Sequence, residues 1–368
     1  MATPKETVWK IDPHTLAKHE ILRRYLAAWF PILLSKRHKR VIYIDGFAGP
    51  GRYNGGEIGS PIIALQEAMK QGQRLQGKKL TFLFMDAEND RIEHLKTELA
   101  NLSIPDNFNI NTVAGEFDIE FKALLDYVSK EDRQLAPTFA FIDPFGFKGL
   151  PFELVKRLLE KPQTEVFINL MADSINRFLT HPDHQTTQHI IDLFGTPEVL
   201  DVAQNAGDRL TNLRLLYQKQ LKNSAQFVRF FEMKNKHNRT IYYLFFATNH
   251  PLGHKKMKEA FWKVDASSGF IFSDQTNPNQ LVLFEHDESA ILAKEIYNHF
   301  LNRRVSVEHI EKYVEDETSF LSKHMRSALR QLETENKIRV DEYKKDGNRR
   351  RKGSFPNTVT VQFVQTLF

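Results

Sequence analysis

The chain contains no cysteine among its 368 residues. A disulfide framework, a thiolate metal site and a cysteine nucleophile are therefore excluded. Long apolar runs are also missing, since the longest are much shorter than the ~20 residues that a membrane span requires. The opening stretch "MATPKETVWKIDPH" lacks the apolar core of a secretory signal. These absences predict a cytoplasmic protein without a membrane partner.

The composition is ordinary for a globular chain. Hydrophobic residues make up 41% and charged residues 26%, and the 29 phenylalanines supply a large core. The length favours about two domains. The net charge of +5 permits a nucleic-acid partner but is weak evidence for one. His181 and His184 with Asp183 have a metal-like spacing, which we interpret as a solvated loop rather than a zinc site.

Apolar strands alternate with helices through most of the chain. After a helix expected at 12–35, the first five strands are expected at 40–45, 80–86, 109–115, 138–143 and 165–171. Continuous apolar strands separated by helices predict a parallel sheet that is covered on both faces.

A hairpin breaks this alternation. Beyond a helical insertion at about 172–224, strands at 225–234 and 239–250 are joined by the short polar link "NKHN", which predicts antiparallel pairing. Five βα units closed by such a hairpin are typical of the seven-stranded, Rossmann-like α/β sheet of class I methyltransferases, rather than of the all-parallel dinucleotide fold.

The C-terminal part has a different pattern. Three helices are followed by two strands that flank "KKDGNRRRKGSFP", which predicts a winged helix-turn-helix at 286–368 after a methyltransferase-like domain at 1–285. Basic residues on one face of the third helix would enter a major groove while the wing contacts phosphate. A wing that docks a protein is the alternative. The expected nucleic-acid-binding residues are Lys323, Arg326 and Arg330 on the helix, and Arg349, Arg350 and Arg351 in the wing.

The stretch "VIYIDGFAGPGRY" at 41–53 ends a strand on an acid and continues in a glycine-rich loop. Ligands of open α/β sheets bind at such strand ends. The dinucleotide fingerprint is absent, and a helix that starts only near Ser60 counts against a pyrophosphate, which needs a helix N-terminus close by. S-adenosyl-L-methionine suits the loop better, although an ordinary glycine-rich turn is the alternative. Its methionine part is expected at Asp45, Gly46, Phe47, Gly49 and Gly51.

Acids follow the next two strands. Asp86 ends the second strand, where an acid accepts hydrogen bonds from ribose hydroxyls, and Glu88 could share this role. Asp118 follows the third strand and is expected to reach the adenine amino group, with Phe117 against the ring. For each acid, the alternative is a carboxylate favoured by a helix N-terminus.

The fourth strand ends in "FIDPFGFKG". At Asp143, Pro144 and Phe145, an exocyclic amine could donate hydrogen bonds to the carboxylate and to a backbone carbonyl held by the proline. Its nitrogen lone pair would then face the methyl donor. A strand-end turn is the alternative. Because methylation of cytosine at carbon-5 needs a thiolate, the missing cysteines leave an amine or another heteroatom as the target.

Several stretches together resemble one known family: "WKIDPHTLAKHEILRRYLAAWFPIL", "YIDGFAGPG", "GSPIIAL", "FIDPFGF" and "FATNHPLGHKKMKEAFWKV". Over about residues 9–272 the chain is similar, in patches, to the three-Cys-motif partner family of bacteria and archaea, which is regarded as methyltransferase-like. The family name refers to cysteines in a neighbouring protein. The resemblance therefore implies a separate protein partner, often associated with phages or mobile elements.

Two further residues and one turn refine this prediction. Lys18 lies before the first strand, where it could contact the methionine carboxylate or simply occupy the polar face of a helix. The Asp-Pro-Phe-Gly run also resembles the turn of tRNA guanine-N2 dimethyltransferases. Phe145 stands where the adenine-specific pattern has a second proline, so the target base stays open.

The sequence therefore predicts an S-adenosylmethionine-dependent methyltransferase that acts on an exocyclic amino group of a base in DNA or RNA. Two alternatives remain. One is a non-catalytic module that binds the cofactor or docks a partner in a two-protein mobile-element or phage-defence system. The other is a protein methyltransferase.

Overall fold

The computed structural model describes residues 4, 6–35, 38–131, 134–204, 207–265, 268–274, 289–343 and 347–365. The chain forms two units. The first contains the helices and strands up to residue 264 and a short strand at 271–273, and the second contains those from residue 289 onward. The domain boundary expected between 285 and 286 lies outside the described residues.

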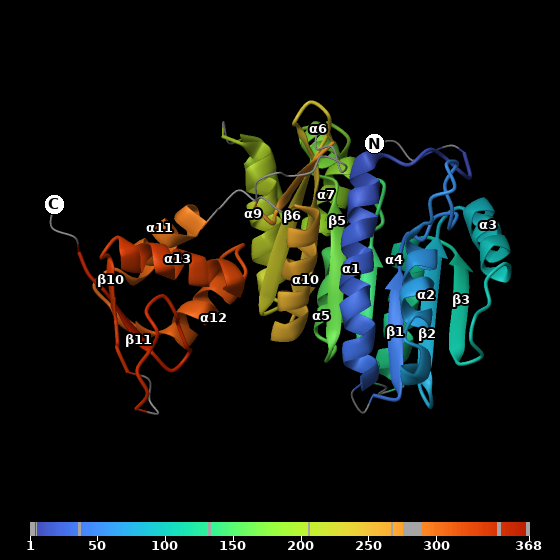
Figure 1. Cartoon of the computed structure of the whole chain (residues 1–368). Helices are drawn as coiled ribbons and strands as arrows, with labels where there is room; N and C mark the ends of the chain where they lie inside the picture. Colours follow the sequence, from blue (N-terminus) through green and yellow to red (C-terminus); the bar gives the residue numbers. More distant parts are fainter. Residues whose placement is uncertain are drawn as a thin grey trace. The chain divides into compact units, whose positions relative to one another are not determined.

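A mainly parallel sheet forms the centre of the first unit. Its strands are β1 (Arg40–Asp45), β2 (Lys79–Asp86), β3 (Phe108–Ala114), β4 (Thr138–Ile142), β5 (Thr164–Leu170), β6 (Phe227–Lys234), β7 (Thr240–Thr248) and β8 (Ile271–Ser273). They lie in the order β3-β2-β1-β4-β5-β7-β6-β8 (Figure 1). β1 to β5 pair in parallel, whereas β7 is antiparallel to both β5 and β6. This arrangement confirms the predicted class I methyltransferase-like fold.

The predicted number of strands was wrong, because the sheet has eight strands instead of seven in the part of the chain that the structure describes. The additional strand, β8, pairs in parallel with β6 through only three residue pairs. A segment of three residues is too short to show the alternation by which strands are found in a sequence.

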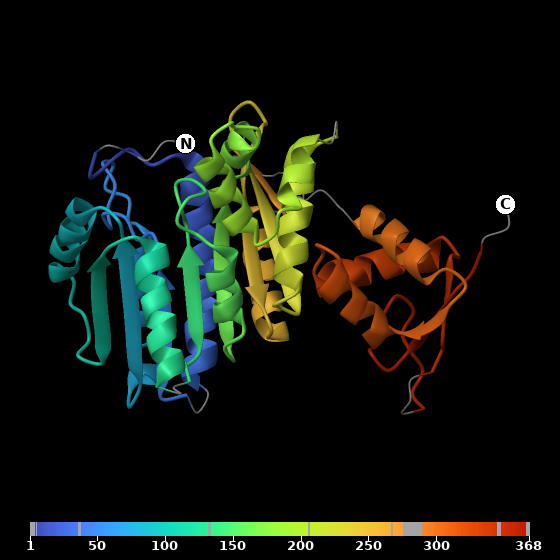
Figure 2. The ribbon, with the colours of Figure 1, turned by 180° about the vertical axis from the view of Figure 1, so that it is seen from behind.

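Helices cover both faces of this sheet, as the two opposite views show (Figures 1 and 2). One hydrophobic core lies between the sheet and α1, α2, α3 and α10, and the other lies between the sheet and α4 to α9. β4 and β5 are buried along their whole length, which explains their continuous apolar sequences. No helix of the described segments has the length and apolarity that crossing a membrane requires.

The helices of the first unit have these bounds: α1 (Pro13–Ser35), α2 (Ser60–Met69), α3 (Asn89–Ala100), α4 (Phe117–Lys130), α5 (Phe152–Leu159), α6 (Ala172–Phe178), α7 (His184–Phe194), α8 (Val199–Gln204), α9 (Arg209–Lys222), α10 (Pro251–Val264) and the short 3₁₀ helix η1 (Gly72–Leu75).

The second unit is a winged helix, as predicted. Its elements are α11 (Ser289–Phe300), β9 (Arg304–Ser306), α12 (Val307–Glu317), α13 (Ser322–Thr334), β10 (Ile338–Val340) and β11 (Thr360–Phe363). Ser306 caps α12 by accepting a hydrogen bond from the His309 amide at 3.2 Å. The three strands pair antiparallel in the order β10-β11-β9, and β9 was not predicted.

Candidate active site and nucleic-acid interface

The glycine-rich loop follows the carboxyl end of β1, the strand that lies between β2 and β4 in the sheet. Gly49 and Gly51 have φ angles of 64° and 82°, which glycine adopts without strain. A Cβ atom on Gly46 would lie 2.6 Å from the ring of Phe117, so this position has no room for a side chain. The following helix begins at Ser60, in agreement with the predicted late start.

Asp45 lies beneath this loop and is 0% exposed. Its carboxylate accepts hydrogen bonds from the Tyr43 hydroxyl and the Phe47 amide, both at 3.4 Å. Burial raises the pKa of Asp45 to about 7, the hydrogen bond from Ser60 opposes this rise, and the charge of Asp143 adds to it. In this structure, Asp45 supports the loop from inside the protein and presents no surface to a ligand.

Asp86, at the end of β2, is attached to the same loop. It accepts hydrogen bonds from the Gly49 amide at 3.0 Å and from the Glu88 amide at 2.9 Å, and Arg91 lies 3.5 Å away. Asp86 is 4% exposed, and burial raises the pKa of its carboxyl above the usual value. Glu88, by contrast, is exposed. The two acids therefore differ, since one fixes the loop and the other faces solvent.

A buried polar cluster joins α1 to the ends of β4 and β5. The Lys18 ammonium pairs with one carboxylate oxygen of Asp143, and the Asn169 side-chain amide donates to the other oxygen at 2.8 Å. Lys18 and Asn169 are 4% and 3% exposed. Each carboxylate oxygen can accept a second hydrogen bond, so Asp143 keeps some acceptor capacity.

Two buried atoms in this region have no hydrogen-bond partner among the described residues. They are His19 Nδ1 and Asn169 Oδ1. Burial lowers the pKa of His19 to about 3, with a further contribution from the Lys18 charge, so the imidazole is neutral near pH 7. Polar atoms that are buried without a partner are rare and call for an explanation.

Aromatic rings surround the turn after β4. The ring of Phe145 lies 5.5 Å from that of Trp9, edge to face, and 5.4 Å from the Arg91 guanidinium. Trp9 in turn lies 5.5 Å from the ring of Tyr53, which belongs to the loop after β1. The residues before α1 thus bridge the ends of β1 and β4.

A pocket of about 550 Å³ opens at this edge of the sheet. Of the predicted site residues, Phe47, Asp86, Glu88, Pro144 and Phe145 line it. The structure therefore brings together predicted residues from the ends of three strands.

Asp118 does not line this pocket. Its carboxylate accepts a hydrogen bond from the neighbouring Ile119 amide at 3.0 Å, within the first turn of α4. Glu116, two residues earlier, lines the pocket instead, and Arg177 and Phe178 of α6 line it from the helical insertion.

Several residues of this site were not predicted from the sequence. Asn169 carried a signal, because an amide inside the apolar strand "EVFINLM" needs a polar partner. Arg91 and Trp9 had no signal, since a charged residue in a helix and a tryptophan near the N-terminus are ordinary features. Asp183, which lies between His181 and His184 in the stretch with metal-like spacing, caps α7 by accepting a hydrogen bond from the Thr186 amide at 2.8 Å.

The predicted nucleic-acid interface in the second unit is partly exposed. Lys323, Arg326 and Arg330 are exposed along α13, and Arg351 is exposed in the wing. The Arg349 side chain is 75% exposed and lies 3.6 Å from Glu342.

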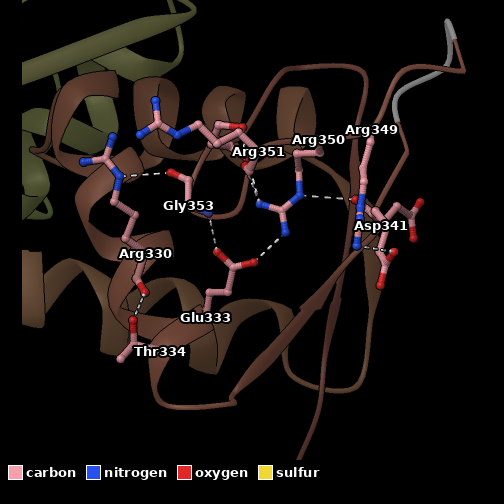
Figure 3. A network of polar contacts seen from close by, with 10 residues as sticks. Arg330, Glu333, Thr334, Asp341, Arg349, Arg350, Arg351 and Gly353 are labelled. Atoms are coloured by element: carbon pink, nitrogen blue, oxygen red, sulfur yellow. Dashed lines mark hydrogen bonds and ion pairs between the residues drawn. The ribbon is translucent and has the colours of Figure 1, made fainter.

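Arg350 differs from the other predicted basic residues. Its side chain is only 6% exposed and pairs with Glu333 at 2.5 Å (Figure 3). The basic run in the wing therefore alternates between surface and interior, and Arg350 does not belong to the exposed interface.

Comparisons with known proteins found one family model and several solved structures that are similar to parts of this chain. Residues 270–344 match a family model described as a GMT-like wHTH domain. Protein LPL1258 from Legionella pneumophila has a TM-score of 0.41 and 13% identity, over 69% of this chain and 90% of that chain. The O-methyltransferase from Bacillus cereus in complex with SAH has a TM-score of 0.35 and 12% identity, over 65% of this chain and 82% of that chain. No curated protein matches the chain.

Proposed function

We propose that this protein is an S-adenosylmethionine-dependent methyltransferase that acts on an exocyclic amino group of a nucleic-acid base, in DNA or RNA. The observation that carries the proposal is the cluster at the ends of β4 and β5, in which the buried Lys18 and Asn169 hold the partly exposed Asp143. It lies beside β1, where the strand order reverses, and ligands of open α/β sheets bind at this switch point.

The residues present are suited to such a cofactor. The pocket at the strand ends has a volume of about 550 Å³, which is in the usual range for sites of small ligands. His19 Nδ1 and Asn169 Oδ1 offer polar atoms that the described protein groups leave without partners. Glu88 and Glu116 supply carboxylates at the pocket for hydroxyl and amino donors.

S-adenosylmethionine, when bound, supplies an electrophilic methyl group on a sulfonium. In the proposal, Lys18 and the loop from Gly46 to Gly51 hold the methionine part. Asp86 fixes the loop, while Glu88 accepts hydrogen bonds from the ribose. The adenine amino group is assigned to Asp118 or to the neighbouring Glu116.

Asp143 and Pro144 would position the target amine. Asp143 is held by two donors, and its remaining lone pairs can accept hydrogen bonds from an amino group. Holding the amine in this way orients its nitrogen lone pair, so the gain in rate comes from positioning. Phe145 lines the pocket and is packed against Trp9, and it could contact the ring of an extruded base.

The proposal includes two macromolecular partners. The exposed basic side chains of α13 and the wing support binding of nucleic acid by the second unit. The resemblance to the three-Cys-motif partner family supports a second protein that carries the cysteines this chain lacks.

One observation favours a second candidate function. Both oxygens of Asp143 already accept hydrogen bonds from the protein, so the turn after β4 is satisfied without a substrate. A module that binds the cofactor and docks a partner, without methyl transfer, would have this arrangement.

Calorimetry with S-adenosylhomocysteine tests cofactor binding. Wild-type protein is expected to bind saturably. Asp86→Asn and Glu88→Gln should both weaken binding, because one loosens the loop and the other removes a ribose acceptor. Glu93→Gln, which removes the same charge from an exposed position on α3, is the matched control. No binding at high micromolar ligand would remove the cofactor from the proposal.

A labelled-methyl assay with DNA, RNA and the partner protein tests catalysis. Transfer to nucleic acid that Asp143→Asn abolishes, while binding of S-adenosylhomocysteine persists, supports the proposed role of Asp143. Undiminished transfer by this variant removes Asp143 from the mechanism. Label on the protein partner alone indicates a protein methyltransferase, and absence of transfer with intact cofactor binding favours the non-catalytic module.

A further inference from the structure

A carboxylate of α13 binds the base of the wing, which we define as residues 350–354, at two points. Glu333 accepts from the Arg350 guanidinium at 2.5 Å and from the Gly353 amide at 3.0 Å (Figure 3). Each oxygen of Glu333 therefore binds a different group of the wing base. Hydrogen bonds that involve a charged group are among the stronger ones.

Arg350 continues this network into the sheet. Its guanidinium donates to the backbone oxygens of Asp341 at 3.2 Å and Ser354 at 2.9 Å, and it lies 5.6 Å from the ring of the buried Phe355. A guanidinium has five N–H donors, and several of these are engaged inside the unit. Arg350 therefore acts as a framework residue that fixes the wing.

This attachment brings two exposed basic residues to one side. Arg330 donates through Nε to the Gly353 oxygen at 3.0 Å, which ties its guanidinium to the wing base. In Figure 3, Arg330 and Arg351 lie on one side of the network and Arg349 lies on the other. Arg326 and Lys323 continue the basic face along α13, one and two turns before Arg330.

We propose that Glu333 and Arg350 are positioning residues that lock the wing to α13, so that Arg330 and Arg351 together bind the phosphate backbone of duplex DNA. This inference rests on the proposed nucleic-acid binding by the second unit. Guanidinium groups suit phosphate because their forked donors match its oxygens. Two guanidinium groups that are already fixed relative to each other lose less conformational entropy on binding than two groups on a mobile loop.

Duplex DNA fits this surface better than duplex RNA. The major groove of B-form DNA admits an α-helix, whereas the major groove of A-form RNA is too narrow to be read by side chains. The charge distribution also indicates which helix contacts the DNA. Acidic residues are frequent in α12, with the sequence "VEHIEKYVEDE", whereas the basic residues lie on α13. α13 is therefore the helix that faces the DNA.

One substitution separates positioning from charge. Glu333→Gln removes a negative charge close to the binding surface, so electrostatics alone would raise the affinity for a polyanion. If Glu333 locks the wing, the same substitution releases the wing base and lowers the affinity. The two effects have opposite signs.

Fluorescence anisotropy measures the affinity of the full chain for a labelled DNA duplex of mixed sequence, over a series of salt concentrations. We expect Glu333→Gln to weaken binding about fivefold or more. The matched control is Glu335→Gln, which makes the same charge change at a position paired with Lys337. This control should bind as tightly as wild type or more tightly.

A second pair of variants avoids the buried network. Arg351→Gln alters an exposed side chain and should weaken binding and reduce the salt slope by about one. Arg339→Gln, at an exposed position on β10, is the charge-matched control and should have a smaller effect. Circular dichroism shows whether each variant keeps its fold.

The outcomes are distinct. Equal or tighter binding by a folded Glu333→Gln variant, or equal effects of Arg351→Gln and Arg339→Gln, overturns the positioning inference while nucleic-acid binding stands. Preference for duplex RNA overturns the assignment to DNA. Failure of the wild-type chain to bind any nucleic acid refutes the proposed binding function itself.

Discussion

Replacing Asp45 with asparagine should change how the stability of the first unit depends on pH. The carboxyl group is fully buried, and burial raises its pKa to about 7. In the unfolded chain, an aspartate titrates near a pKa of ~3.9. Between these values the folded state binds more protons than the unfolded state. The stability that Asp45 contributes is therefore largest below about pH 4 and is lost as the pH rises through 7.

The size of the effect follows from the two pKa values. A rise from 3.8 to about 7 on folding corresponds to ~4 kcal/mol over the whole range, of which about 3 kcal/mol falls between pH 5 and pH 8. Asparagine has no proton to lose. Between pH 5 and pH 8, the unfolding free energy of wild type should therefore fall by about 3 kcal/mol relative to that of Asp45→Asn.

Other buried groups do not obscure this comparison. Burial lowers the pKa of His19 and of His254 to about 3. Each therefore contributes stability that is present above about pH 6.5 and is lost as the pH falls toward 3. Both proteins contain these histidines, so their contribution cancels in the difference.

Urea unfolding followed by tryptophan fluorescence at pH 5, 6, 7 and 8 is the suitable assay. All three tryptophans, at positions 9, 29 and 262, belong to the first unit, so the signal reports on that unit alone. The slopes against urea must agree for the comparison to hold. A constant offset between the two proteins at every pH would show that Asp45 titrates normally, and would refute the argument from burial.

Two further predictions concern the same edge of the sheet. Gly46→Ala should destabilise the first unit by about 1–3 kcal/mol in urea unfolding, because its Cβ would meet the Phe117 ring. Gly146→Ala is the control, since the space around its Cβ is open. Equal stability of the two variants would contradict the prediction. Lys18→Met should destabilise by about 2 kcal/mol or more, since it leaves the Asp143 carboxylate without its cation. Combined with Asp143→Asn, it should cost less than the sum of the single changes, and strict additivity in this double-mutant cycle would show that the pair does not interact.

The sequence predicted the architecture well, because the architecture follows from patterns. Buried strands between amphipathic helices and the short hairpin link at 235–238 were sufficient to predict a mainly parallel sheet that ends in an antiparallel hairpin. The three-residue β8 and β9 have no such pattern. They form because neighbouring strands offer an edge, which is information that a local segment does not contain.

The candidate site was predictable only in outline. Asp45 and Asp143 occupy equivalent places in the sequence, at the end of an apolar strand, yet one lies beneath a loop and the other pairs with α1. Arg350 stands among basic residues but is turned inward by Glu333, which precedes it by 17 positions. The direction of these side chains depends on partners that are distant in sequence, so neither spacing nor composition could reveal it.

The position of α1 has a consequence for synthesis of the chain. Lys18 pairs with Asp143, which lies 125 residues later in the chain. The His14 carbonyl accepts a hydrogen bond from the hydroxyl of Tyr242, which lies 228 residues later. At the usual rates of translation, the apolar face of α1 would remain incompletely covered for on the order of 10–50 s before that second contact is possible. α1 is therefore synthesised long before its packing partners are complete, and a nascent chain stalled before β7 would be a natural client for chaperones.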